Sequence, residues 1–260
     1  LIFGEGEWLG DKYVGEFNNW EKHGKGTYYS SNGDKYIGVF KDDSITYGTF
    51  IYGDGELKND RYVGEFIEWE FNGKGSYFSD SIGNYEGEFK DNKIINGTYK
   101  YEDGDRYIGD FKDWSRHGNG LYITAEGEKY EGIFKDDSFV YGTLTFGKGQ
   151  REGEKYIGEF KEWIFNGKGT YSYGNGDYYE GEFKDGEFNG KGKLIISENE
   201  LKGDMEGIFK NGEFYDGRLD VIAKNGDRFL GTIKEGIKWN LVIKDKNGKI
   251  IESYINGLKQ

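Results

Sequence analysis

Histidine and paired acids are the residues of this chain whose types could support acid–base or metal chemistry. Its two histidines, His23 and His117, each follow a tryptophan by three positions and stand four repeating units apart. At about 4.8 Å per strand, four two-stranded units predict a separation of roughly 40 Å, so the two imidazoles cannot share a metal ion or a triad. We expect both to be turn residues without a catalytic role, and we predict that the chain is not an enzyme.

Paired carboxylates are the second candidate for chemistry. Asp42-Asp43 and Asp136-Asp137 could contribute to a calcium site, which needs six to eight oxygen ligands. However, no stretch matches the spacing of an EF-hand loop, and Gly-x-Gly pairs such as Gly4-Glu-Gly6 lack the strand–loop–helix context of a phosphate loop. We interpret the acidic pairs as solvated turns, and we predict no metal site and no cofactor.

Tryptophans and tyrosines that recur at fixed positions of the repeating unit are the most informative residues about a possible binding surface. Alternate units carry Trp20, Trp69, Trp114 and Trp163, and later in the same units Tyr28, Tyr77, Tyr122 and Tyr171. One interpretation is structural: each indole packs over its own turn and sets the register of two units. The other is functional, because large amphipathic rings are favoured binding anchors. The eight residues are therefore our predicted partner-binding set, with one Trp–Tyr group about every 19 Å.

The element that must position these residues is a repeat of about 22 to 26 residues. Its first half reads Y-x-G-x-F, as in Tyr156–Phe160, and its second half reads G-x-G-x-Y, as in Gly167–Tyr171. Such a period is typical of repeat architectures. The first half restarts at Tyr13, Tyr36, Tyr62, Tyr85, Tyr107, Tyr130, Tyr156 and Tyr179, with weaker copies at Met205 and Phe229. The first four starts recur 94 residues later, which indicates duplication of a four-repeat block.

Each repeat is predicted to be a β-hairpin. The period of two places Tyr13, Gly15 and Phe17 on one face of the first strand, and Gly24, Gly26 and Tyr28 on one face of the second. Rings lying flat over these glycines would offset the usual weakness of glycine in strands. Turns such as Asn32-Gly33, Asp103-Gly104 and Asn175-Gly176 tolerate positive φ and suit the joins between repeats.

The predicted fold is therefore all-β: an elongated, twisted, single-layer antiparallel sheet of tandem hairpins, roughly 95 Å long. Residues 1–12 are interpreted as a partial leading repeat, since Phe3–Gly10 looks like the second half of an earlier one. Residues 13–204 hold about eight repeats in two blocks, and 205–260 are degenerate repeats that cap the C-terminal end. A small separate subdomain over 205–260 is the alternative. The absence of an initial methionine indicates a fragment or processed chain.

Composition narrows the function further. The 260 residues have a net charge of −13, no cysteine, no proline and 45 glycines. Nucleic acids and anionic membranes bind clustered Lys and Arg, so the charge argues against both partners. Missing cysteine excludes disulfides and thiolate metal sites, and proline would interrupt a continuous ladder. No apolar run has transmembrane length and no signal peptide is visible.

The repeat resembles the MORN repeat, whose pattern runs roughly Y-E-G-E-F-K-D-G-x-x-H-G-K-G-x-Y. The best matching stretches are Tyr179–Gly186 and His23–Tyr28, and the resemblance recurs in phase over nearly all of 13–228. It implies a ladder of hairpins used as a scaffold or protein-binding surface, without catalysis. It also implies cytoskeletal, ciliary or membrane-apposed assemblies as settings.

Three functions follow from these observations. The leading prediction is a cytoplasmic, non-enzymatic scaffold that binds a partner helix or extended peptide along the aromatic–glycine face; a homodimer is left open. The resemblance also implies phospholipid-surface association, against which the charge of −13 counts. The third function, also implied by the resemblance, is a regulatory repeat region of a larger enzyme. Flotation with anionic vesicles separates the second from the first, and the full reading frame tests the third.

Overall fold

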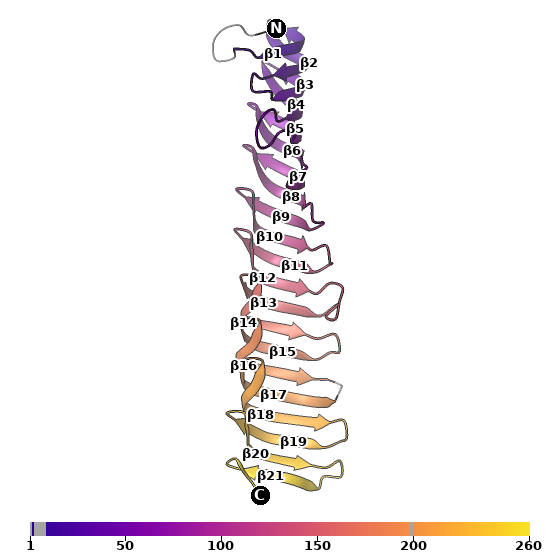
Figure 1. The fold of residues 1–260 in the computed structure, drawn as a ribbon, viewed down its shortest axis with the longest axis vertical. Coiled ribbons are helices and arrows are strands. Elements are labelled where there is room, and N and C mark those ends of the chain that lie inside the picture. The colour runs from indigo at the N-terminus through magenta and orange to yellow at the C-terminus, as the bar shows by residue number, and fades with distance from the viewer. Residues whose placement is uncertain (1, 3–8, 198–199) are drawn as a thin grey trace. The chain divides into compact units, whose positions relative to one another are not determined.

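The structure, a computed structural model, describes residues 2, 9–197 and 200–260. These residues form 22 antiparallel β-strands of one open sheet and contain no helix, which confirms the predicted all-β class. Consecutive strands make successive hairpins (Figure 1). The chain divides into two compact units, the first reaching Ala125 and including Lys135–Asp137, the second holding the rest. We describe each unit by itself. The leading half-repeat proposed at Phe3–Gly10 lies almost entirely outside the described residues.

The first unit holds five hairpins, in which each strand pairs with the next in sequence. Its strands are β1 (Lys12–Asn18), β2 (Glu21–Tyr29), β3 (Lys35–Lys41), β4 (Ser44–Ile51), β5 (Arg61–Ile67), β6 (Glu70–Ser79), β7 (Gly83–Lys90), β8 (Lys93–Lys100), β9 (Arg106–Lys112) and β10 (Ser115–Ile123). The repeats predicted at Tyr13, Tyr36, Tyr62, Tyr85 and Tyr107 each form one of these hairpins.

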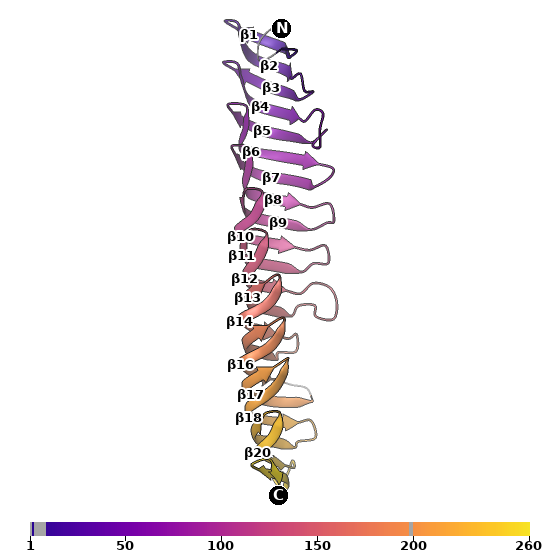
Figure 2. The same ribbon diagram turned by 60° about the vertical axis from the view of Figure 1, so that its left-hand side comes forward.

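The second unit continues the same succession of hairpins, which Figure 2 shows turned by 60° from the view of Figure 1. Its strands are β11 (Lys129–Lys135, whose last residue falls in the first unit), β12 (Ser138–Thr145), β13 (Lys155–Lys161), β14 (Ile164–Ser172), β15 (Tyr178–Lys184), β16 (Glu187–Ile196), β17 (Leu201–Lys210), β18 (Glu213–Ala223), β19 (Arg228–Lys234), β20 (Ile237–Lys244), β21 (Ile250–Ile255) and β22 (Leu258–Lys259). Each strand from β12 onward pairs with the next.

A row of glycines crosses the strands at one level. In the first unit the register pairs Gly15 with Gly26 and Gly26 with Gly38, and the row continues, one glycine per strand, to Gly120 in β10. A second row runs from Gly142 in β12 to Gly217 in β18. Each hairpin within these rows has a register shift directly after the glycine pair or one residue pair further on, and such bulges bend a strand.

Tyrosine rings cover the glycine pairs, which confirms the predicted arrangement. The ring of Tyr62 is fully buried, and a Cβ added to Gly64 or Gly75 would lie 2.3 Å from one of its atoms. Its hydroxyl donates a hydrogen bond of 2.8 Å to the carbonyl oxygen of Glu65, at the bulge. The same hydroxyl-to-carbonyl bond, three residues apart, is made by Tyr13, Tyr85, Tyr107, Tyr156 and Tyr179. Only glycine leaves room for a ring at this level.

The C-terminal strands keep the hairpin plan while the core becomes aliphatic. In β17–β22, Leu219, Val221, Leu241 and Ile243 form a buried cluster, against which Met205 and Phe229 pack. Residues 205–260 belong to the same compact unit as the preceding hairpins, so they are not the separate subdomain considered above.

Candidate binding surface

The four tryptophans occupy the turns themselves. In each of these hairpins the two residues between the strands have positive φ, as in a type I′ turn, and the tryptophan is the second of them. The φ values of Trp20, Trp69, Trp114 and Trp163 are 70°, 71°, 69° and 65°. Position two of such a turn normally holds glycine, and an L-residue there costs about 1–2 kcal/mol.

The half-buried indoles, those of Trp69 and Trp163, contact earlier hairpins, whereas the structural interpretation above had each indole pack over its own turn. The ring of Trp69, in the β5–β6 turn, lies 5.1 Å from that of Tyr28 in β2 and 5.1 Å from that of Tyr36 in β3. The ring of Phe40 also belongs to this group and lies 6.0 Å from the indole of Trp69, and the ammonium of Lys22 lies 5.9 Å from the same indole. We call such a ring group a tryptophan cage. It ties a hairpin to the two that precede it.

The other tryptophans differ in how far they are covered. Trp163 sits in a second cage, 5.2 Å from Tyr130 and 6.1 Å from Phe134, and Trp114 packs on Tyr77 at 5.8 Å while staying 41% exposed. Trp20 is 96% exposed. The predicted tryptophan set is therefore mixed: two indoles are half-buried, and two are available to a partner.

The predicted tyrosines stabilise the open end of each hairpin, which lies opposite the turn that carries the tryptophan. Each donates its hydroxyl to a carboxylate 17 residues earlier: Tyr77 to Asp60 at 2.7 Å, and likewise Tyr28 to Asp11, Tyr122 to Asp105 and Tyr171 to Glu154. Tyr28, Tyr77 and Tyr171 are buried and Tyr122 is half-buried. These rings support the surface from inside, so a contact between them and a partner stays a prediction that their burial does not favour.

Burial is the main cause of the raised pKa values of these hydroxyls. It raises the pKa of Tyr28, Tyr77, Tyr122 and Tyr171, and the hydrogen bond to the neighbouring carboxylate adds to the shift. Burial likewise raises the pKa of Tyr36 to about 12, with Asp34 and Tyr52 contributing. The protonated phenol is the form that donates to a carboxylate, so these side chains hold the fold at neutral pH.

The predicted acidic turns prove to be structural acceptors. The backbone N–H of Lys22 donates to the Asp43 carboxylate at 2.9 Å, and that of Arg116 donates to Asp137 at 2.9 Å. Asn92 accepts in the same way from Phe71 at 2.8 Å. Asp42 and Asp136, the first residues of their turns, are exposed. The acidic pairs are therefore not simply solvated, because the second residue of each binds the neighbouring hairpin.

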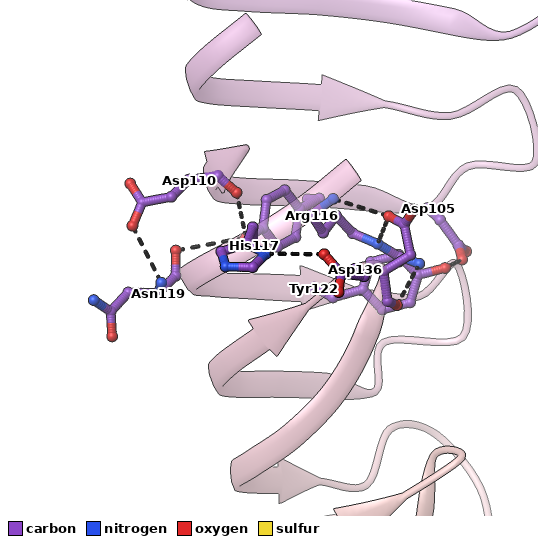
Figure 3. Close-up of polar contacts among 9 residues, drawn as sticks. Asp105, Asp110, Arg116, His117, Asn119, Tyr122 and Asp136 are labelled. Atoms are coloured by element: carbon purple, nitrogen blue, oxygen red, sulfur yellow. Dashed lines mark hydrogen bonds and ion pairs between the residues drawn. The ribbon is translucent and has the colours of Figure 1, made fainter. Parts of the chain in front are cut away.

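The histidines lie in second strands, not in turns as predicted: His23 in β2 and His117 in β10. Figure 3 shows His117 beside Asp136, with Nδ1 of the imidazole 3.3 Å from Oδ1 of the carboxylate. The same view shows Asn119 donating its backbone N–H to Asp110 and Tyr122 reaching Asp105. These contacts connect turns and bulges, and among the described residues no group of three or more His, Cys, Asp or Glu side chains could hold a metal ion.

A surface that the sequence interpretation missed lies on the face opposite the rings. Over β4–β8 a hollow of about 480 Å³, the first hollow, has Gly64, Gly75, Gly87 and Gly97 in its lining. Tyr47 and Val63 supply apolar walls, and Lys74, Glu65, Glu86 and Glu88 line it as well. The side chains alternate with the ring-bearing residues along each strand, so they point away from the aromatic core. The bulges bend the strands where the hollow lies.

A second hollow occupies the corresponding place in the second unit. It measures about 650 Å³ and lies over β12–β16, with Tyr141, Ile157, Glu159, Lys168 and Glu180 in positions 94 residues after those of the first. Glu182 and Lys191 complete the charged lining. Two hollows of the same design in separate units follow directly from the duplicated block. Apolar residues directly before glycines of the two rows, such as Tyr47, Val63, Tyr141 and Ile157, were the sequence signal for this surface.

The charges of both hollows favour a basic ligand. Glu65 accepts from the backbone N–H of Lys74 at 3.3 Å, and Glu159 accepts from that of Lys168 at 3.0 Å. Within the part of the chain that the structure describes, Glu86, Glu88 and Glu180 are exposed and make no ion pair. Three carboxylates thus face one ammonium in the first hollow, and three face two in the second.

Comparison with known proteins agrees with the hairpin plan. A family model for the MORN repeat matches residues 13–35, 85–94, 96–106, 107–129, 130–151, 156–178 and 179–197, about half of the chain, and no catalytic family is found. The repeats starting at Tyr36 and Tyr62 are not matched, although β3–β6 fold as the same hairpins. The search of curated proteins finds no match. No helix in the described residues is long and apolar enough to cross a membrane. With seven matched repeats and the fold that they predict, this chain belongs to the MORN repeat family.

Proposed function

We propose that the chain is a non-enzymatic scaffold whose two hollows bind an extended, basic segment of a partner protein. The observation that carries this proposal is the repetition of one hollow design in two units, each with a glycine floor, a tyrosine wall and an excess of carboxylates. Unpaired glutamates provide complementary charge, which gives selectivity and a fast approach.

This proposal moves the binding face predicted from sequence. The aromatic–glycine face is filled by the chain's own buried rings, such as Tyr13, Tyr62 and Tyr85, so it has little room for a partner. The tryptophan column remains the rival surface, because Trp20 and Trp114 are exposed. As a setting for such a scaffold, we propose a cytoskeletal or ciliary assembly in the cytoplasm.

The test uses a displayed library of random 12-residue peptides. We expect selected peptides to be rich in Lys and Arg alternating with apolar residues, and to bind the chain with an affinity that falls as salt rises. Glu86→Lys with Glu88→Lys should weaken binding at least tenfold at the first hollow. Tyr47→Ala should also weaken peptide binding at the first hollow, because it removes the tyrosine ring that forms its apolar wall. Fluorescence anisotropy of a labelled peptide measures each effect, with the second hollow inactivated by Glu180→Lys and Glu182→Lys.

A matched control separates local charge from net charge. Glu102→Lys with Asp103→Lys makes the same change in an exposed loop outside the hollow and should leave binding nearly intact. If Trp114→Ala abolishes binding while the hollow variants bind normally, the tryptophan column is the true surface. If anionic vesicles, but no peptides, float with the chain, the proposal fails in favour of membrane association.

A further inference from the structure

One turn of the second unit has glycine where two other turns have a caged tryptophan. The β17–β18 turn has the same two-residue form as the turn of Trp69, and its second residue is Gly212. The φ of Gly212 is 81°, near the 71° of Trp69, so its backbone already has the conformation that presents an indole. The N–H of Gly212 donates to the carbonyl oxygen of Phe188 at 3.0 Å, which fixes the turn against β16. A tryptophan cage without its tryptophan is therefore expected beside this turn.

A cavity of about 260 Å³ lies at this place, and we call it the open cage. Its lining includes Phe165, Tyr171, Phe183, Phe188 and Gly212. The three hairpins that build it, β13–β14, β15–β16 and β17–β18, are all among the described residues. Tyr171 occupies the place in its hairpin that Tyr28 occupies in the first one, and Tyr28 lies 5.1 Å from the ring of Trp69. One wall of the open cage thus matches a wall that packs on an indole.

Two phenylalanines extend this match to the other filled cage. Phe183 and Phe188 have the strand positions that Phe134 and Phe139 have two hairpins earlier. In that cage the ring of Trp163 lies 6.1 Å from that of Phe134 and is stacked on that of Phe139 at 6.2 Å. Apolar cavities of about 150 Å³ hold a benzene ring, so the open cage, at about 260 Å³, has room for an indole.

The charged groups of the lining suit an indole better than a phenyl ring. Arg151 and Glu187 belong to the lining and are exposed, and within the part of the chain that the structure describes neither makes an ion pair. The cage of Trp69 also has a cation, the ammonium of Lys22, 5.9 Å from its ring. An indole face attracts a cation more strongly than other aromatic faces do, and a buried indole N–H needs an acceptor. Arg151 supplies the cation, and Glu187 supplies the acceptor.

We infer that the open cage binds a tryptophan side chain of a partner protein. The filled cages show which occupant this arrangement of rings accepts: an indole carried by a polypeptide backbone in a tight turn. At Trp69 and Trp163 the chain supplies that ring itself, whereas at Gly212 it has no side chain to offer. The rings of the open cage belong to the face opposite the two hollows, so the inference does not rest on the proposed binding of a basic segment.

Titration with N-acetyltryptophanamide, a capped tryptophan residue, tests the inference by calorimetry and saturation-transfer-difference NMR. A ligand of this size should bind with a Kd on the order of 0.1–1 mM. Gly212→Trp fills the open cage from within the chain, and the change is sterically open because a Cβ there meets nothing within 4 Å. We expect it to weaken binding roughly tenfold or more. Gly248→Trp is the matched control, since it places a tryptophan at another open position of positive φ, outside the lining, and should bind like the wild type.

Two exposed positions keep the test decisive even where Gly212→Trp does not fold. Arg151→Ala and Glu187→Gln should each weaken the binding of N-acetyltryptophanamide several-fold, and Glu187→Gln should leave the weaker binding of N-acetylphenylalaninamide unchanged, because phenyl has no N–H to donate. Wild-type chain that binds no N-acetyltryptophanamide at about 10 mM, well above the expected range, overturns the inference. Wild-type affinity in folded Gly212→Trp, or in both exposed variants, also overturns it. Free tryptophan that binds far more tightly than the capped form would assign the cage to a small molecule and overturn the partner protein.

Discussion

Tyrosine has two roles in these hairpins, and its strand decides which one it plays. A first-strand tyrosine such as Tyr85 lies over glycines and donates its hydroxyl to backbone carbonyls at the bulge. A second-strand tyrosine such as Tyr77 donates to a buried carboxylate in the loop between repeats. Both hydroxyls are buried with a partner, so neither ring imposes the cost of an unsatisfied polar group.

Tyr77→Phe tests the carboxylate contact. The change leaves Asp60, which is 6% exposed, without its phenolic donor. A buried charged acceptor that loses its partner should lower the free energy of unfolding by roughly 1–3 kcal/mol. Urea denaturation at pH 7 measures the loss. Tyr47→Phe removes an exposed hydroxyl and serves as the control; equal unfolding midpoints for both variants would show that the buried pair contributes nothing.

Gly87→Val tests the ring-over-glycine packing. A Cβ at Gly87 would lie 2.4 Å from the hydroxyl of Tyr85 and 2.3 Å from the carbonyl oxygen of Asn96. Neither can move without breaking the hydrogen bond that joins them, so we expect a loss of about 1–3 kcal/mol, as for other overpacking changes. Gly174→Val, where nothing lies within 4 Å, should be close to neutral in the same urea experiment. Similar losses at both positions would contradict the packing argument.

At the scale of elements, the tryptophan turns connect hairpins that are not adjacent in sequence. Trp69 extends from the β5–β6 turn to β2 and β3, so it fixes the orientation of three hairpins at once. A left-handed residue with a large side chain is uncommon and signals a compensating interaction or a function. The half-buried indoles of Trp69 and Trp163 make a compensating interaction, and the exposed indoles of Trp20 and Trp114 are candidates for a function.

Trp69→Gly and Trp20→Gly form a matched pair at this scale. Both remove an indole and both relax the same positive φ, so only the lost packing distinguishes them. Trp69→Gly should lower the unfolding free energy by about 2 kcal/mol, because the packing of a half-buried ring is lost. Trp20→Gly should be neutral or stabilising by up to about 1 kcal/mol. Thermal unfolding at low micromolar protein concentration measures both changes. If Trp20→Gly loses more unfolding free energy than Trp69→Gly, the ring of Trp20 must be packed against other side chains.

Much of the element plan could be predicted from the sequence, because period-two alternation and the spacing of Gly and Tyr determine strands and faces. The cages could not be, since the contact of Trp69 with Tyr28 joins residues two repeats apart and depends on how bent hairpins nest. The hollows were missed for a related reason. Tyr47, Glu86 and Glu88 resemble a solvent-exposed face in the sequence, but the bulges after Gly64 and Glu88 bend this face inward.

For the whole molecule, charge is the property that every repeat shares. The chain has 48 acidic and 35 basic residues, so it repels itself at neutral pH and loses that repulsion near its isoelectric point of about 4.8. Acid has a second effect, because carboxylates also serve as acceptors in the links between hairpins. Asp43 and Asp137 in the first unit and Asp177 in the second all accept backbone N–H groups.

Stability should therefore fall steeply once the pH drops below about 4.5. Burial opposes ionisation of Asp43, but its hydrogen bonds from Lys22 prevail and lower its pKa. The hydrogen bond from Arg228 lowers the pKa of Asp220, and those from Lys259 and Tyr254 lower that of Glu252 to about 2. A carboxylate whose pKa is lower in the folded state stabilises the fold above its unfolded pKa, near 4, and loses that contribution as pH falls through the folded value.

Urea midpoints measured between pH 7 and pH 2 test this argument across the chain. We expect midpoints that change little, or rise slightly, from pH 7 to 5 as repulsion is relieved, and then decline down to pH 2, where the 35 basic residues also repel one another. Glu252→Gln should be less stable than the wild type at pH 7, with the difference shrinking between pH 4.5 and about 2 because that is where the wild-type carboxylate protonates. A constant difference over this window would assign the loss to packing, and unchanged midpoints down to pH 2 would show that charge plays no part in joining the hairpins.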